Sequence, residues 1–311
     1  MSWRFPRAQR GPPENEKITQ SNEIILRTFK AGNDALRARN YEEAIKQYDE
    51  GIAADPKHPG LPSLLTNKSV ALKARGVERF NAAVASKDAE VRLPGLEAAK
   101  TDFRDAAEVS SSALQMLKAQ AAPEEAAAKS AYAANKYYAL AARAEAMRLV
   151  VLKVDPTQVD AGLAAYQEYM EAETAPDKKT KAQVDIAKML LDIGASEKAF
   201  GEYQKILATD PDNAEGLFGA GFALAALDDK TKNQQAVDYL RRFLSAAPAT
   251  HIGRDDAQAM IALLQEPENS ATEGSAAEGS NAKYEGDMTT PTRSKAAPTR
   301  KKATPTRRKT P

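Results

Sequence analysis

The stretch FKAGNDALRARNYEEAIKQYDEGIAADP, residues 29–56, decides the fold of this chain. Its apolar residues recur at helical spacing, which predicts two short amphipathic helices joined by a turn at Asn40-Tyr41. The second helix is expected to end at Asp55-Pro56, because proline cannot continue a helix. Two helices of this size cannot bury their apolar faces alone, so the stretch predicts a unit that stacks on further units.

A spacing pattern in the second helix recurs along the chain. Ala44 is followed by a large residue at +4, by another residue of the same helical face at +7, and by proline at +12. The small residue lets a neighbouring helix approach closely, and the large residue fills the space beyond it. Five units are predicted from the sets Ala44, Tyr48, Gly51 and Pro56; Ala99, Phe103 and Ala106; Ala165, Tyr169, Ala172 and the shifted Pro176; Ala199, Tyr203, Ile206 and Pro211; and Ala236, Leu240, Phe243 and Pro248.

These residues resemble the tetratricopeptide repeat family. A unit of that family is a helix-turn-helix of about 34 residues, with a small residue in its first helix and an Ala-x-x-x-aromatic-x-x-Ala face in its second. Gly32, Ala187 and Gly221 stand at the small position of the first helix. The prediction is therefore an all-α solenoid over residues 22–266, with units at about 22–56, 61–120, 123–176, 178–211 and 212–248 and a capping helix at 253–266.

Two of the five units are longer than the family's repeat. Successive alanines of the pattern lie 55, 66, 34 and 37 residues apart, so only the later units keep the period. Long Ala-rich helices are expected from Ser63 to about Ser86 and from about Pro123 to Val154. Such helices could pack on each other as a lengthened pair, or they could form a coiled-coil contact with another chain.

The segments that flank the solenoid differ from it in composition. Residues 1–21 are predicted to form a disordered N-terminal arm, and residues 267–311 a disordered linker and basic tail in which Pro-Thr-Arg recurs. The whole chain carries +1, so the 287 residues before Met288 carry about −7. The tail could serve solubility, or it could bind nucleic acid or an anionic membrane surface through Arg293, Lys295, Arg300, Lys301, Lys302, Arg307, Arg308 and Lys309.

The resemblance implies a scaffold whose concave face, lined by the first helix of each unit, holds a peptide or another protein. Repeat spacing places six candidate contact residues near that face: Phe29, Asn33, Asn67, Lys73, Lys188 and Phe222. Each candidate also has a purely structural interpretation. The two phenylalanines could belong to the core, the two lysines could be ordinary surface charges, and the two asparagines could form hydrogen bonds to nearby backbone.

One branch of the family holds the terminal carboxylate of heat-shock chaperones with two asparagines and several basic residues. Asn33 and Asn67 stand at the two asparagine positions, but Phe29 stands where that branch has a lysine. A groove for a more apolar ligand is therefore the preferred hypothesis.

Catalytic and metal-binding functions find little support in the residues. The chain has no cysteine, and His58 and His251 are far apart in sequence, so no metal site or cofactor is expected. The sequence GLFGAGF at 216–222 follows no predicted strand, which argues against phosphate binding. No nucleophile with a base partner is visible, and no apolar run is long enough to span a membrane. The main prediction is a cytoplasmic, non-enzymatic interaction scaffold, and the alternative is a polyanion-associated adaptor that acts through the tail.

Overall fold

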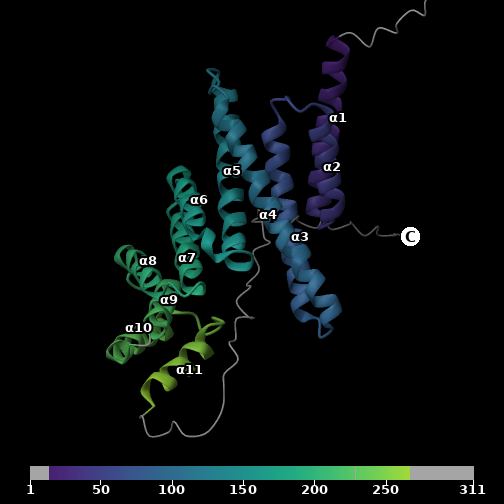
Figure 1. The fold of residues 1–311 in the computed structure, drawn as a ribbon. Coiled ribbons are helices and arrows are strands. Elements are labelled where there is room, and N and C mark those ends of the chain that lie inside the picture. Colours follow the sequence, from purple (N-terminus) through teal and green to yellow (C-terminus); the bar gives the residue numbers. More distant parts are fainter. Residues whose placement is uncertain (1–13, 228, 267–311) are drawn as a thin grey trace, which may run out of the picture. The chain divides into compact units, whose positions relative to one another are not determined.

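The computed structural model describes residues 14–227 and 229–266, and this range is helical almost throughout (Figure 1). No strand occurs in these residues, which confirms the all-α prediction. The short 3-10 helices η1 (Pro156–Gln158) and η2 (Lys230–Lys232) precede α6 and α10. The α-helices are α1 (Glu14–Arg37), α2 (Tyr41–Ala54), α3 (Leu61–Ala85), α4 (Ala89–Ala119), α5 (Ala126–Lys153), α6 (Val159–Ala172), α7 (Pro176–Asp192), α8 (Ser196–Thr209), α9 (Ala214–Ala225), α10 (Asn233–Ala246) and α11 (Arg254–Gln265).

The helices form two layers. Each helix packs against the next one in the chain, and each odd-numbered helix from α1 to α9 also contacts the following odd-numbered helix. Comparable contacts between successive even-numbered helices are absent within the described part of the chain. The first helices of the pairs thus form the closer-packed layer of a stack in which each pair contacts only its neighbours, as in a solenoid.

A ring packed over a glycine joins the two helices of a pair. Tyr48 lies over Gly32 and Phe103 over Gly76, so that a Cβ built on these glycines would meet ring carbons at 2.5 and 2.6 Å. Both rings are buried. Only a residue without a side chain permits this approach. The sequence pattern did not identify Gly76, because it lies 23 residues before Ala99 instead of the 12 to 15 found in other units.

An even tighter contact of a ring with a glycine lies between two successive pairs, at α8 and α9, and it supports a first prediction. A Cβ at Gly219 would stand 2.0 Å from Cζ of the buried Tyr203, whereas a Cβ at Gly201, on α8, meets nothing within 4 Å. We expect Gly219→Ala to lower the free energy of unfolding by about 1–3 kcal/mol through overpacking. Gly201→Ala is the matched control and should raise it by about 0.5–1 kcal/mol, since alanine favours the helix. If the urea unfolding midpoint shifts in the same direction in both variants, relative to the unchanged chain, the close contact between Gly219 and Tyr203 is contradicted.

The three longest helices pack on one another within the chain. α4 has 31 residues, against 14 for α2, α6, α8 and α10. α3 packs along most of α4, from Gly95 to Leu117, and α5 packs along its second half, so α4 belongs to two hairpins that project toward opposite ends in Figure 1. Leu114 and Leu117 of α4 are buried against Leu140 of α5. These long helices therefore pack on one another within the chain, as expected for a lengthened helical pair.

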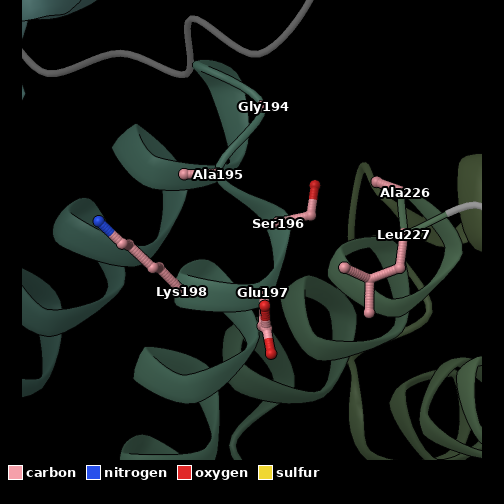
Figure 2. A pocket seen from close by; sticks show the side chains of 7 residues that line it. All are labelled: Gly194, Ala195, Ser196, Glu197, Lys198, Ala226 and Leu227. Carbon is pink, nitrogen blue, oxygen red and sulfur yellow. The ribbon is translucent and has the colours of Figure 1, made fainter.

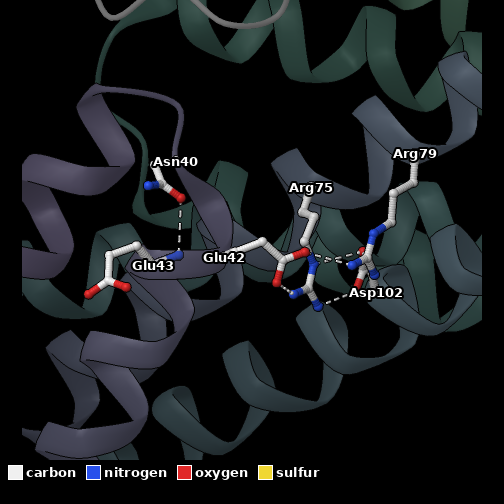
Figure 3. A network of polar contacts seen from close by, with 6 residues as sticks. All are labelled: Asn40, Glu42, Glu43, Arg75, Arg79 and Asp102. Carbon is white, nitrogen blue, oxygen red and sulfur yellow. Dashed lines mark hydrogen bonds and ion pairs between the residues drawn. The ribbon is translucent and has the colours of Figure 1, made fainter.

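An ion network centred on a buried aspartate holds α2, α3 and α4 together (Figure 3). Asp102 of α4 is 1% exposed and accepts two hydrogen bonds from the guanidinium of Arg75, at 2.6 and 3.1 Å, and one from Arg79 at 3.0 Å. Both arginines also donate to Glu42 of α2, at 2.9 and 2.8 Å. The network thereby connects the first helix pair with the second.

The predicted register of the third unit is wrong by three residues. The buried residues of α6 are Gly162, Ala165 and Tyr166, whereas Tyr169 is half-buried and Ala172 is exposed. The pattern thus begins at Gly162, where a Cβ would meet neighbouring side chains at 3.0 Å, and Tyr166 supplies the ring. Two small residues and two tyrosines at equal spacing allow both registers, and the sequence does not decide between them.

The N-terminal prediction also needs correction. α1 begins at Glu14, so the predicted disordered arm at 1–21 is wrong from this residue onward. The early start has a local reason, since prolines at 12 and 13 followed by the acidic Glu14 and Glu16 favour a helix N-terminus.

Candidate protein-binding surface

Two predicted contact residues meet between α1 and α3. Nδ2 of Asn67 donates to Oδ1 of Asn33 at 2.8 Å, and the hydroxyl of Tyr48 donates to the same oxygen at 2.8 Å. Burial raises the pKa of Tyr48 to about 12, so the phenol stays protonated and can donate. The amide of Asn33 is therefore fixed in one orientation, with its NH₂ group turned away from both partners.

Phe29 and Leu26 lie on the same face of α1 as Asn33. Phe29 is half-buried and packs against the core of the first three helix pairs. Core packing was the alternative to ligand contact that the sequence offered for this residue. Leu26, which the sequence analysis missed, is 71% exposed. Spacings of three and seven residues place Leu26, Phe29 and Asn33 in one stripe. Because Leu26 lies in this stripe, the helical periodicity of α1 could have identified it as a contact candidate from the sequence.

Lys73 takes part in an ion pair across the odd-numbered layer. Its Nζ lies 3.9 Å from the Glu145 carboxylate of α5, and each side chain is 23% exposed. Burial opposes the charge on Glu145, but Lys73 and Arg148 outweigh it and bring the pKa of Glu145 below its ordinary value. Lys73 is thus a paired, partly covered charge that ties α3 to α5.

A stripe of alternating charge runs along α7 through Lys181, Asp185, Lys188 and Asp192. Lys181 pairs with Asp185 at 3.0 Å, and Lys188 pairs with Glu215 of α9 at 2.7 Å. Burial raises the pKa of both Asp185 and Asp192. The second half of the odd-numbered layer therefore has a polar surface in which opposite charges already face one another.

Phe222 belongs to an aromatic cluster at the C-terminal end of the stack. Its ring is 4.5 Å, centroid to centroid, from Phe218, and Phe218 is 5.0 Å from Phe243. Phe222 is half-buried in this cluster. Of the six predicted residues, Asn33 and Asn67 are thus in contact with each other. Phe29 and Lys73 lie on the same two helices, α1 and α3, whereas Lys188 lies on α7 and Phe222 on α9.

A shallow hollow elsewhere on the surface brings no further candidate. Figure 2 shows the side chains of Ser196, Glu197 and Lys198 pointing in different directions around it, so they form no acid-base set. In the described residues, no three acidic or histidine side chains are placed to hold a metal ion. No helix in the same range is long and apolar enough to cross a membrane. The hollow is lined by Gly194, Ala195, Ser196, Glu197, Lys198, Ala226 and Leu227.

The eight basic residues predicted to bind polyanions all lie in the tail. They are outside the described residues. The tail hypothesis therefore stays a prediction from the sequence.

Comparison with known proteins gives distant matches among solved structures. No protein-family model and no curated protein matches the chain. The crystal structure of YrrB, a TPR protein with an unusual peptide-binding site, shares 15% identity over 79% of this chain and 98% of that one, with a TM-score of 0.45. The TPR2AB domain of yeast Sti1 in complex with pHSP90 shares 16% identity over 79% of this chain and 100% of that one, with a TM-score of 0.30. The arrangement of its own helix pairs and the small-residue contacts inside them give the chain the fold of an α-solenoid of helix-turn-helix repeats, the fold that the resemblance of its sequence to the tetratricopeptide repeat family predicts.

Proposed function

We propose that the chain is a non-enzymatic scaffold that binds an extended peptide or protein segment on the odd-numbered helix layer. The amide arrangement of Asn33, Asn67 and Tyr48 is the observation that carries this proposal. An asparagine whose oxygen is already occupied offers two N–H donors, and a donor held in place by its neighbours loses little entropy when it binds. A ligand that follows the layer would meet this donor between α1 and α3.

The ligand chemistry follows from the surroundings of the asparagine pair. The neighbouring lysines of α3 are engaged, Lys68 with Asp49 at 2.6 Å and Lys73 with Glu145. Phe29 and the exposed Leu26 add apolar surface. An uncharged acceptor next to an apolar side chain fits such a site better than a terminal carboxylate does, because a buried carboxylate needs a cation. We therefore favour a main-chain carbonyl as the group that Asn33 contacts.

Peptide selection with point variants tests this function. Peptides selected from a random-sequence library on the full chain are expected to bind Asn33→Ala and Asn67→Ala about tenfold more weakly, the typical effect of one lost hydrogen bond. Asn81→Ala is the matched control, since Asn81 is an exposed asparagine on the same helix as Asn67. Circular dichroism verifies that each variant stays helical.

The proposal would be wrong under either of two outcomes. The first is a library that yields no binding peptide at all. The second is a set of selected peptides that bind Asn33→Ala, Asn67→Ala and Asn81→Ala as tightly as the unchanged chain.

A further inference from the structure

The buried ring of Tyr203 carries a hydroxyl without a hydrogen-bond partner. Tyr203 of α8 is 1% exposed, and its ring packs on Gly219 of α9. No residue in the described part of the chain forms a hydrogen bond with its hydroxyl. A polar group that is nearly buried and has no partner is uncommon in folded proteins, so its position needs a physical reason.

The first helix pair shows what this hydroxyl lacks. Tyr48 occupies the corresponding place there, and its hydroxyl donates to Asn33. Lys188 of α7 stands at the position of Asn33, since each of the two directly follows the small residue of its helix. Nζ of Lys188 pairs with Glu215 at 2.7 Å instead of facing Tyr203. The fourth pair therefore keeps the buried ring but not the amide that satisfies its hydroxyl.

Asp192 is a second polar group without a partner on the same helix layer. It is the last residue of α7, it is exposed, and it forms no ion pair or hydrogen bond with any described residue. Lys188 lies one turn before it on the same face but is engaged with Glu215. Burial raises the pKa of Asp192 by more than the attraction of Lys153 and Arg148 lowers it. Asp192 is thus a carboxylate that is open to solvent on one side and surrounded by protein on the others.

Negative charge predominates around the hydroxyl of Tyr203. Burial raises the pKa of this phenol, and the carboxylates of Asp192, Glu215 and Asp185 raise it further. α8 packs against both α7 and α9, which are neighbours in the odd-numbered layer, so the hydroxyl lies among carboxylates of both helices. Asp185 and Glu215 already have lysine partners, at 3.0 and 2.7 Å. The carboxylate that remains for a ligand is that of Asp192.

We propose that Asp192 and the hydroxyl of Tyr203 form a subsite for one basic side chain, lysine or arginine, of the bound segment. The inference rests on the proposed function, because the subsite belongs to the same odd-numbered layer as the donor at Asn33. An ammonium or guanidinium group has several N–H donors and no acceptor, so it can donate to the carboxylate and to the phenol oxygen at once. Such charge-assisted hydrogen bonds are about twice as strong as neutral ones.

Peptides selected from the random-sequence library on the full chain test the subsite. They are expected to be enriched in lysine or arginine over the unselected library. Asp192→Asn and Tyr203→Phe should each bind a selected peptide about tenfold more weakly, the effect of one lost hydrogen bond to a charged group. Glu171→Gln is the matched control, since Glu171 is an exposed carboxylate on the even-numbered helix α6. It should change the affinity by less than about twofold.

A change in the peptide shows whether its basic residue meets Asp192. Replacing that residue with norleucine should cost about tenfold on the unchanged chain and nothing further on Asp192→Asn, because two changes to one contact are not additive. The urea unfolding midpoint of Asp192→Asn should be no lower than that of the unchanged chain, since no described residue pairs with Asp192.

A small probe separates the subsite from the contact at Asn33. N-acetyl-arginine amide, added to the full chain, is expected to shift the backbone amide resonance of Gly219 in ¹H–¹⁵N spectra, because Gly219 lies against the ring of Tyr203. N-acetyl-norleucine amide should leave this resonance in place. Neither probe should shift it in Asp192→Asn.

Two results would overturn the subsite. One is a set of selected peptides without enrichment in lysine or arginine that bind Asp192→Asn as tightly as the unchanged chain. The other is an arginine probe that leaves the resonance of Gly219 unshifted. A library that yields no peptide, or normal binding by Asn33→Ala, contradicts the proposed function, and the arginine probe then decides the subsite by itself.

Discussion

Replacing Phe103 with alanine is expected to lower the free energy of unfolding by about 3–5 kcal/mol. The ring is 1% exposed and fills the space over Gly76 between α3 and α4. Gly76 has no side chain that could fill the cavity left by the ring, so the loss should be near the upper end for a buried aromatic residue. Urea unfolding followed by circular dichroism measures the effect.

Phe103→Leu is the control for this prediction. Leucine retains much of the buried volume, so its loss should be about 1–2 kcal/mol. If Phe103→Ala changes the free energy of unfolding by less than about 1 kcal/mol, the ring does not hold α3 and α4 together in the way described.

The second large effect is expected from Asp102→Ala, with a loss of about 3 kcal/mol. Asp102 is the buried carboxylate between Arg75 and Arg79 (Figure 3), and removing it leaves two guanidinium groups partly covered and without their main partner. Because both arginines keep Glu42, the loss should stay at the lower end of the range for broken buried pairs.

Glu42→Gln is the matched variant at the exposed end of the same network. The Glu42 side chain is 68% exposed, and a surface ion pair contributes about 1 kcal/mol or less. Equal losses for Asp102→Ala and Glu42→Gln would show that burial of the carboxylate is not what gives the network its strength.

The fold could be predicted because its signals are local. The pattern that joins Ala44 to Tyr48 and Gly51 lies on one helix, and a spacing on one helix can be found without knowledge of its partners. The same spacing fails where two registers fit equally, as at Gly162 and Ala165. The long helices were visible as irregular distances between units, although the sequence does not show that α4 belongs to two hairpins.

The candidate site could be predicted only in part. Asn33 and Asn67 lie 34 residues apart, one repeat period, so their positions on neighbouring first helices follow from the repeat. Their shared contact with Tyr48 depends on side-chain orientations that a repeat spacing does not specify. The ion pairs of Lys73 and Lys188 likewise depend on carboxylates 72 and 27 residues further on, at Glu145 and Glu215. For such contacts the distance along the chain gives no signal.

The packing of each helix against near neighbours has a consequence for how the chain folds. Contacts that join residues close in sequence require the closure of only short loops, which favours rapid folding that can begin at any pair and spread in both directions. The terminal pairs have a neighbour on one side only, so they are the first to detach. Partly folded chains that have lost one end therefore precede full unfolding, and a single transition midpoint averages over them.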